Sequence, residues 1–110
     1  LSTPPRGSKI MSFQSKKLRK SAKDEQCTLQ IPNVCNRNRD TVVLAHINTE
    51  GGMIGGKSDD FSACFACFNC HTYLDNNRLT SEDELFYTRR AMVRTWRRWL
   101  QRNTISIEGS

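Results

Sequence analysis

The chain has 110 residues, which is enough for one modest hydrophobic core, so a single domain is expected. Its 17 lysines and arginines against 11 acidic residues give a formal net charge of +6, which favours a polyanion such as nucleic acid as the partner. Five cysteines, an odd number, and no long apolar run argue against a disulfide scaffold or a membrane protein. The thiols are therefore expected to be reduced and cytoplasmic, with metal binding as their use.

Residues 1–13 lack periodicity and are predicted to be a disordered leader or an expression remnant. The lysine-rich segment 14–25 is predicted to form a short helix or a basic arm. Its basic side chains are either simply solvated or in contact with phosphates, and the candidates for such contacts are Lys16, Lys17, Arg19 and Lys20.

The segment 27–35 begins and ends with a cysteine and contains Pro32-Asn33, a dipeptide that predicts a turn. Its flanking residues have strand character, so the segment is a candidate for a metal-binding knuckle. The apolar, β-branched run at 41–47 then predicts a buried strand that carries His46 near its end.

Four glycines within residues 51–56 predict a loop. From Gly51 to Ser58 the sequence also matches the phosphate-binding pattern G-x4-G-K-[ST]. Such a site needs a parallel sheet and a helix that opens at its lysine, and the chain is too short for that sheet. Asp59 and Asp60 follow directly, where their carboxylates would repel phosphate. A nucleotide site is therefore not expected.

Residues 61–67 predict a second short strand that pairs with the first, and the residues from position 70 onward predict a short helix. On such a helix His71 and Asp75 are four residues apart, so they share one face. A histidine and a carboxylate in this arrangement can bind one cation.

Residues 81–103 predict the longest helix, with Ser81 and Glu84 as a capping box, and residues 104–110 a flexible tail. Seven apolar side chains fall on one arc, which is the expected core face: Leu85, Phe86, Met92, Val93, Trp96, Trp99 and Leu100. The opposite side is either a solvated charged face or a phosphate-binding face, formed by Arg90, Arg94, Arg97 and Arg98.

Zinc binds four thiolates in a tetrahedron, and two chain turns that each offer two cysteines meet this need. Cys67 and Cys70 have the usual C-x2-C spacing, and the wider pair Cys27 and Cys35 is the best choice for the other half. Cys64 lies at a rival spacing and is expected to be a spare, buried thiol. A site of four thiolates is closed, so its role would be structural; unmetallated core cysteines are the alternative.

The order of a strand ending in His46, a glycine-rich loop, the motif C-x2-C-H and a helix resembles the HNH, or His-Me finger, endonucleases with their ββα-metal core. With C-x7-C, the segment VLAHI and C-x2-C-H-x3-D, the chain is more closely similar to the small prophage-encoded, YbcO-like family. This resemblance spans about residues 17–100. It implies an α+β fold in which a small zinc-stabilised ββα-metal core and a C-terminal amphipathic helix form one HNH-like domain at 14–103.

The resemblance also implies an activity, the metal-dependent hydrolysis of DNA phosphodiester bonds. His46 would be the general base, His71 and Asp75 would hold a catalytic Mg²⁺ or Mn²⁺, and Asp60 would hold the loop or orient the base. Many HNH enzymes have a metal ligand directly before the base, where this chain has Ala45. Either water or one of the aspartates Asp59 and Asp60 would replace that ligand, or the metal would have no ligand at that position.

The partner implied is DNA, including branched or single-stranded DNA, cut without base specificity or by structure. The protein would be phage- or prophage-encoded, act in the bacterial cytoplasm, serve recombination as one option, and be a monomer or a homodimer with no membrane partner. The rival interpretation is a zinc-stabilised nucleic-acid-binding module without catalysis, which the alanine at position 45 favours.

Overall fold

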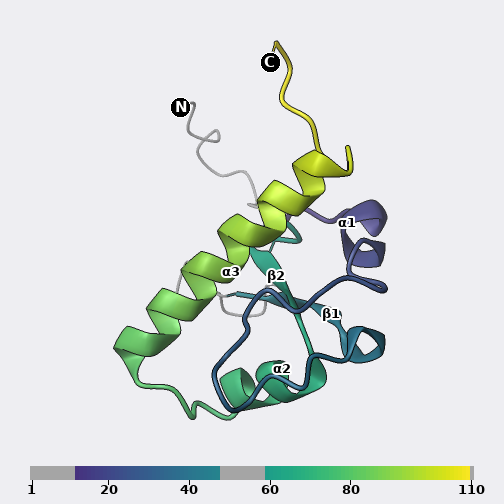
Figure 1. The fold of residues 1–110 in the computed structure, drawn as a ribbon. Coiled ribbons are helices and arrows are strands. Elements are labelled where there is room, and N and C mark those ends of the chain that lie inside the picture. Colours follow the sequence, from purple (N-terminus) through teal and green to yellow (C-terminus); the bar gives the residue numbers. More distant parts are fainter. Residues whose placement is uncertain (1–11, 48–58, 110) are drawn as a thin grey trace.

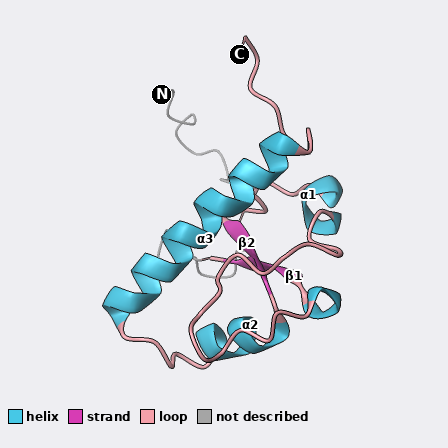
Figure 2. Cartoon of the chain, in the orientation of Figure 1, coloured by secondary structure: helices cyan, strands magenta, loops and turns pink. Residues whose placement is uncertain are grey.

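The computed structural model describes residues 12–47 and 59–109. These residues form a small α+β fold, drawn in Figures 1 and 2, with the elements α1 (Lys16–Lys20), η1 (Arg39–Thr41), β1 (Val43–His46), β2 (Ala63–Ala66), α2 (Phe68–Asp75) and α3 (Ser81–Gln101). The α+β class agrees with the prediction. None of the helices in the described ranges is long and apolar enough to cross a membrane. The glycine-rich loop and residues 1–11 lie outside the described residues.

The sheet consists of β1 and β2, which pair in antiparallel fashion from Val43 opposite Ala66 to His46 opposite Ala63. All four residues of β2 are buried, whereas β1 leaves both of its end residues exposed. The difference arises because α3 lies across β2 and covers it (Figure 1). The predicted pairing of two short strands is therefore confirmed, and the second strand is the centre of the fold.

Helix α3 faces the core with three small residues and Trp99, while most of its other large apolar side chains lie outside the core. The side chains buried along it are Thr88, Ala91, Thr95 and Trp99. The predicted core face is therefore wrong except for Trp99 and the partly buried Met92; five of its members are exposed, namely Leu85, Phe86, Val93, Trp96 and Leu100. At 3.6 residues per turn the apolar arc lies roughly a third of a turn from the buried face. Small side chains allow the helix to approach β2 closely.

Buried hydroxyl groups join three segments at this approach. Thr95 Oγ1 accepts from the Phe65 amide at 3.1 Å and lies 3.0 Å from Thr28 Oγ1. The Thr28 hydroxyl donates to the Phe65 carbonyl at 2.9 Å, so the Thr95 proton points to Thr28. Next to this network the Phe65 ring meets Trp99 edge-on, with ring centroids 6.1 Å apart. The segment around Thr28 is thus tied to both β2 and α3.

The arginine face of α3 is not simply solvated, because it holds the segment that precedes the sheet. Arg98 Nε bonds Glu25 Oε1 at 2.9 Å, and Arg102 binds the other oxygen of the same carboxylate. Glu25 has a side chain only 8% exposed, so this acid is shielded from water when it meets the two cations.

Two further arginines hold the same segment closer to the middle of α3. Arg90 donates to the Leu29 carbonyl at 2.9 Å, and Arg94 donates to Gln30 Oε1 at 3.2 Å. The predicted position of the arginines, opposite the core, is therefore only half right: they lie away from β2 but pack against residues 25–30.

The ends of the elements differ slightly from the sequence-based expectations. Thr80, rather than Ser81, caps α3, since its side chain accepts from the Asp83 amide. Helix α2 begins at Phe68, earlier than expected, with Cys67 as its cap. The lysine-rich segment forms the short helix α1, capped by Ser15.

Phe13 and Ile105 lie just outside the range 14–103 that the sequence assigns to the domain, and both are in contact with it. The Phe13 amide donates to Asp59 Oδ1 at 2.6 Å, and Ile105 packs against the core.

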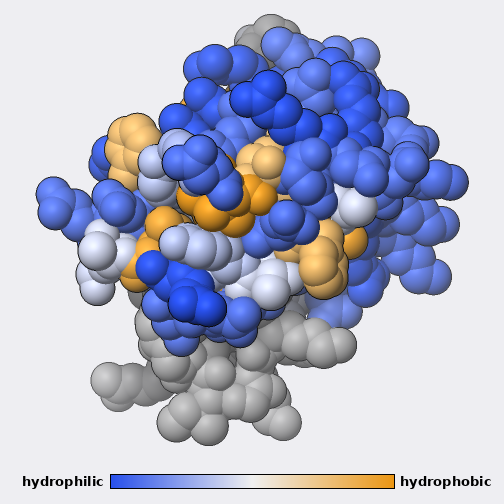
Figure 3. All heavy atoms as spheres, turned by 60° about the horizontal axis from the view of Figure 1, so that its bottom comes forward, coloured by the Kyte–Doolittle hydropathy of each residue, from blue (hydrophilic) through white to orange (hydrophobic). Residues whose placement is uncertain are grey.

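The surface combines many hydrophilic side chains with small apolar areas. On the face shown in Figure 3, hydrophilic residues dominate and hydrophobic ones form separate patches. A further apolar strip begins at Trp96, whose indole donates to the Phe61 carbonyl at 2.9 Å, and it continues through the Phe61 ring to Phe13, 5.8 Å away.

We predict that Thr95→Val will lower the free energy of unfolding by about 1–3 kcal/mol, because the buried Phe65 amide loses its acceptor without access to water. Chemical denaturation measures the change. Thr88→Val is the matched control, since the Thr88 hydroxyl donates only within its own helix, to the Glu84 and Leu85 carbonyls. We expect its effect to stay below about 1 kcal/mol. Equal losses of stability in both variants would mean that the buried network contributes no more than the hydrogen bond of Thr88 within its helix.

Candidate metal centre and active site

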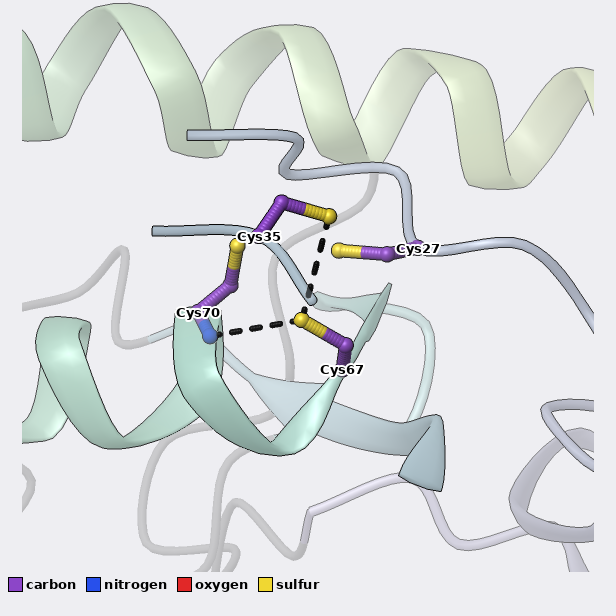
Figure 4. Close-up of side chains that lie close together, drawn as sticks. All are labelled: Cys27, Cys35, Cys67 and Cys70. Atoms are coloured by element: carbon purple, nitrogen blue, oxygen red, sulfur yellow. Dashed lines mark hydrogen bonds between the residues drawn. The ribbon is translucent and has the colours of Figure 1, made fainter. Parts of the chain in front are cut away.

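Four cysteines from two distant parts of the chain converge on one point (Figure 4). The Sγ atoms of Cys27, Cys35, Cys67 and Cys70 all lie within 4.8 Å of one another, and those of Cys35 and Cys67 are 3.9 Å apart. Three of these residues are buried and Cys35 is half-buried. This is the set of four that the sequence predicts.

The first pair comes together through a tight turn. The amides of Val34 and Cys35 both donate to the Ile31 carbonyl, at 3.1 and 3.0 Å. Asn33 adopts a left-handed backbone conformation with φ of 63°, which asparagine tolerates better than most residues. The predicted Pro-Asn turn is thus confirmed, and it folds the chain back so that Cys35 returns to Cys27. The residues around the turn do not form strands.

The second pair is formed by the first turn of α2. Cys67 is the helix cap and its Sγ accepts from the Cys70 amide at 3.4 Å. In the first pair, Cys27 Sγ accepts from the Gln30 amide at 3.5 Å in the same way. Amide donors directed at sulfur favour the thiolate over the thiol, and the thiolate is the form that binds metals.

The electrostatics of the cluster fit a cation. The hydrogen bond from Cys70 lowers the pKa of Cys27 to about 5, against the opposing effect of burial. The same hydrogen bond raises the pKa of Cys70, and burial raises that of Cys35. One sulfur can therefore be charged readily, whereas further thiolates so close together need a positive charge between them.

The geometry and the chemistry of the donors also fit a metal. Four sulfurs at about 2.3 Å from a zinc ion would lie about 3.8 Å apart, close to the 3.9 Å between Cys35 and Cys67. The four cysteines can therefore hold a metal such as zinc. Cys64 is not part of this group; it is fully buried on β2, and burial raises its pKa to about 12.

His46 lies at the end of β1 and is bonded to a buried carboxylate. Its Nε2 is 2.8 Å from Asp60 Oδ1. The other oxygen of Asp60 accepts from the Ser15 amide at 2.7 Å and lies 3.4 Å from Arg19 Nε. Burial alone would raise the pKa of Asp60, but the hydrogen bonds from His46 and Ser15, with the charges of His46 and Arg19, hold the pKa below its usual value.

His71 and Asp75 form a second pair on α2, with Nε2 and Oδ2 3.3 Å apart. Both side chains are accessible, at 36% and 65% of their full exposure. Cys70 directly before His71 is fully buried, because consecutive residues of a helix point about 100° apart. The motif C-x2-C-H thus divides between a buried sulfur cluster and an accessible imidazole.

The two histidine pairs do not merge into one group of ligands. Within residues 12–47 and 59–109, the four cysteines form the only cluster of three or more potential metal ligands. Ala45 is buried opposite Cys64 in the sheet. Both oxygens of Asp60 are already bonded, so this aspartate is poorly placed to replace the ligand that Ala45 lacks.

The basic residues proposed for nucleic-acid contact have mixed surroundings. In α1, Lys17 Nζ reaches the Asn103 carbonyl at 3.4 Å and Arg19 approaches Asp60, while Lys16 and Lys20 are exposed. In α3, Arg97 is exposed, whereas the other three arginines hold residues 25–30 as described above.

Sequence reasoning did not identify Ser15 and Glu25, whose contacts position Asp60 and the cysteine segment. A short hydrogen bond from a backbone amide leaves no trace in the sequence. The one available signal was Glu25, an acidic residue at the end of a lysine-rich run.

We predict that Asp60→Asn will destabilise the fold by about 1–3 kcal/mol at pH 7, because the charged partner of His46 and of the Ser15 amide is lost. The folded-state pKa of Asp60 is lowered, so its contribution is present at neutral pH and is lost as the pH falls through that value. The difference between wild type and variant should therefore shrink below about pH 4. Urea unfolding between pH 3 and 8 measures it.

Asp24→Asn is the control, since Asp24 is exposed and its left-handed φ of 63° suits asparagine. The role of the buried carboxylate would be contradicted if the stability difference between wild type and Asp60→Asn did not change with pH. It would also be contradicted if Asp24→Asn lost as much stability as Asp60→Asn.

Several known proteins are similar to this chain in sequence or in fold. The family model described as "Putative nuclease YbcO" matches residues 16–104. The protein named "Putative nuclease YbcO" from Escherichia coli (strain K12) is 39% identical over 93 residues, covering 80% of this chain and 95% of that protein. The protein "Putative nuclease ybcO" of Enterobacteria phage 82 has the same identity and coverage.

A solved structure described as a "putative bacteriophage protein from Escherichia coli str. K-12 substr. MG1655" is also similar. It superposes with a TM-score of 0.67 at 34% identity, over 79% of this chain and 100% of that one. The match of the family model over most of the chain, and relatives of this identity and coverage, lead to one conclusion: the chain belongs to the YbcO family.

Proposed function

We propose that the protein is a metal-dependent endonuclease of the HNH, or His-Me finger, type that hydrolyses DNA phosphodiester bonds. The observation that carries this proposal is the contact of His46 Nε2 with the buried carboxylate of Asp60 at 2.8 Å. An imidazole at the end of a strand, accessible to solvent and held by a buried acid, is suited to act as a general base.

The contact with Asp60 supports a specific protonation state of the base. An ionised carboxylate only accepts hydrogen bonds, so Nε2 of a neutral His46 carries the proton. Its Nδ1 then has a free lone pair, and this is the atom that would take a proton from the attacking water. Asp60 orients the ring and stabilises the imidazolium formed when that proton arrives.

His71 and Asp75 are the proposed ligands of the catalytic cation, Mg²⁺ or Mn²⁺. A cation bound there would stabilise the charge that develops on the phosphate and on the leaving oxygen. The accessibility of both side chains and their spacing of one helical turn support this role. The names of the relatives as nucleases, and the phage origin of one of them, are consistent with a phage-type enzyme that acts on nucleic acid.

The four-cysteine site is proposed to hold a structural zinc ion. Four sulfurs leave no open coordination position, so this site would hold α2 against the segment 27–35 and take no part in hydrolysis. The start of α2 would then be fixed, and with it the position of His71.

A second function remains a candidate, namely a zinc-stabilised nucleic-acid-binding module without catalysis. The buried Ala45 before the base and the separation of the two histidine pairs favour it. The two functions differ in one property, whether DNA bound by the protein is cut.

We predict that the wild-type protein will nick supercoiled plasmid or cut branched or single-stranded DNA with Mg²⁺ or Mn²⁺, and that His46→Ala will lower the rate by at least about 10²-fold because the base is lost. Gel assays of the cut DNA give the rates. Val43→Ala, an exposed change on the same strand, is the control and should keep the rate. Circular dichroism and bound-metal analysis confirm that each variant is folded.

Two outcomes oppose the proposal in different ways. If wild type binds DNA but cuts none with either cation, the non-catalytic module is the correct function. If folded His46→Ala cuts as fast as wild type, the enzyme has a different base.

For the zinc site we predict that protein purified without chelator contains about one zinc per chain, and that Cys70→Ala loses it together with much of its thermal stability. Cys64→Ala is the matched control, because Cys64 is equally buried but lies outside the cluster. Elemental analysis and thermal unfolding are the measurements. Zinc retained at full amount in Cys70→Ala, or lost equally in both variants, would disprove the assignment of the four ligands.

A further inference from the structure

Two surface pockets lie on either side of the segment that carries Cys27. One pocket, of about 530 Å³, lies between this segment and the C-terminal half of α3. The other, of about 550 Å³, continues along the turn toward Cys35. Both are lined by Gln26, Cys27, Gln30 and Arg39, so the two pockets adjoin each other along this segment.

The walls of these pockets carry an excess of positive charge. Arg39, Arg94 and Arg97 line the pocket beside α3, and Arg37 lines the other one. The one acid in either wall is Glu25, and its two oxygens are already bonded to Arg98 and Arg102. We call the two adjoining pockets, with Arg37, Arg39, Arg94 and Arg97, the arginine groove.

Three of these guanidinium groups have no bonded partner in the described part of the chain. The side chains of Arg37, Arg39 and Arg97 make no hydrogen bond or ion pair among residues 12–47 and 59–109, whereas Arg94 is bonded to Gln30. Arg39 and Arg97 both line the pocket beside α3, and Arg39 lines the other pocket as well. The charges also repel one another: burial, together with the charges of Arg90 and Arg97, lowers the pKa of Arg94. An anion between them would relieve this repulsion.

A simpler purpose would be to balance the charge of the neighbouring sulfur site. A zinc ion with four thiolates carries a net charge of −2, and Cys27 lies in both walls of the groove. The groove has four arginines, so their charge exceeds that of the sulfur site. Charge balance therefore explains only part of the cluster.

The arrangement of the charges indicates what kind of anion fits. A single small phosphate is usually bound where several donors converge on one point, as at a helix N-terminus. Here the cations are spread from the turn near Cys35 to the last turns of α3, along two adjoining pockets. A charge distribution of this shape suits a chain of phosphates.

We propose that the arginine groove binds the phosphodiester backbone of nucleic acid without regard to base sequence, with Arg39 and Arg97 as the main phosphate contacts. This inference rests on the proposed function, because it names where the substrate of that enzyme is held. It also revises the expected contact surface: Arg90 and Arg98 hold the protein together, and Arg39, which the sequence did not single out, takes their place.

The test measures binding separately from cleavage. Fluorescence anisotropy with labelled duplex and single-stranded DNA is performed in the His46→Ala background without added divalent cation. In that background Arg39→Ala combined with Arg97→Ala should weaken binding about 10-fold or more at 0.1 M salt, for every sequence tried. The slope of log affinity against log salt should fall by about 0.9 for each phosphate that the variant no longer neutralises.

Two further variants serve as controls. Lys23→Ala combined with Arg78→Ala removes the same number of positive charges from exposed positions outside the groove, and it should change affinity less than about 2-fold. Arg39→Lys with Arg97→Lys keeps the charges and should retain most of the affinity.

Several results would overturn the proposal. Unchanged DNA affinity in the double alanine variant would show that the groove does not bind the backbone. An equal loss in the Lys23→Ala, Arg78→Ala control would show that only net charge matters. Competition by millimolar inorganic phosphate as effective as that by excess DNA would indicate a site for small anions. Loss of zinc in the double alanine variant, restored together with affinity by the lysine variant, would assign these charges to the sulfur site instead.

The same data separate this proposal from the endonuclease assignment. If the groove variants lose DNA binding but the wild-type protein cuts no DNA, the groove proposal is supported and the endonuclease proposal is wrong. If the groove variants still bind DNA and the wild-type protein cuts it, the endonuclease proposal is supported and the groove proposal is wrong.

Discussion

The segment from Glu25 to Cys35 has no helix or strand, so other parts of the chain must hold it in place. Buried threonine hydroxyls tie it to β2 and α3, the arginines of α3 bind its carbonyl and side-chain oxygens, and the sulfur atoms meet those of α2. The rest of the structure depends on this docking. Without the docked segment, part of β2 would be exposed and the four sulfurs could not meet. The arginine groove would also lack the residues that line it opposite α3.

Helix α3 serves three purposes on three sides, which explains why its pattern was misleading. One side, with small residues and Trp99, packs on the sheet; the second, with arginines, binds the segment around Cys27; the third carries large apolar side chains that stay exposed. A periodic apolar arc normally marks the core face, because burial of large side chains releases the most free energy. Here close packing against β2 requires small residues such as Ala91, and the tiny sheet cannot cover a broad helix face.

The parts of the fold that follow from neighbouring residues were predictable from the sequence. The Pro-Asn turn, the C-x2-C turn at the start of a helix and the two short strands depend on local spacing and are present in the structure. The four-cysteine group joins distant segments, and it was predictable because the chemistry of zinc calls for two such pairs of thiolates. The other parts that depend on distant partners were not predictable. Glu25 and Arg98 are far apart in the sequence, as are Asp60 and the Ser15 amide, and no local pattern indicates that they meet.

The origin of the two halves of the sulfur cluster also governs the order in which the molecule can form. Cys27 and Cys35 leave the ribosome first, and residues 36–66 must follow before Cys67 and Cys70 can join them. Closing such a long loop costs conformational entropy before any contact compensates for it. A metal captured early by the first pair would hold only two ligands, and its affinity would rise steeply when the second pair arrives. If the cysteines hold a metal as proposed, the last step of folding would therefore depend on the supply of that metal.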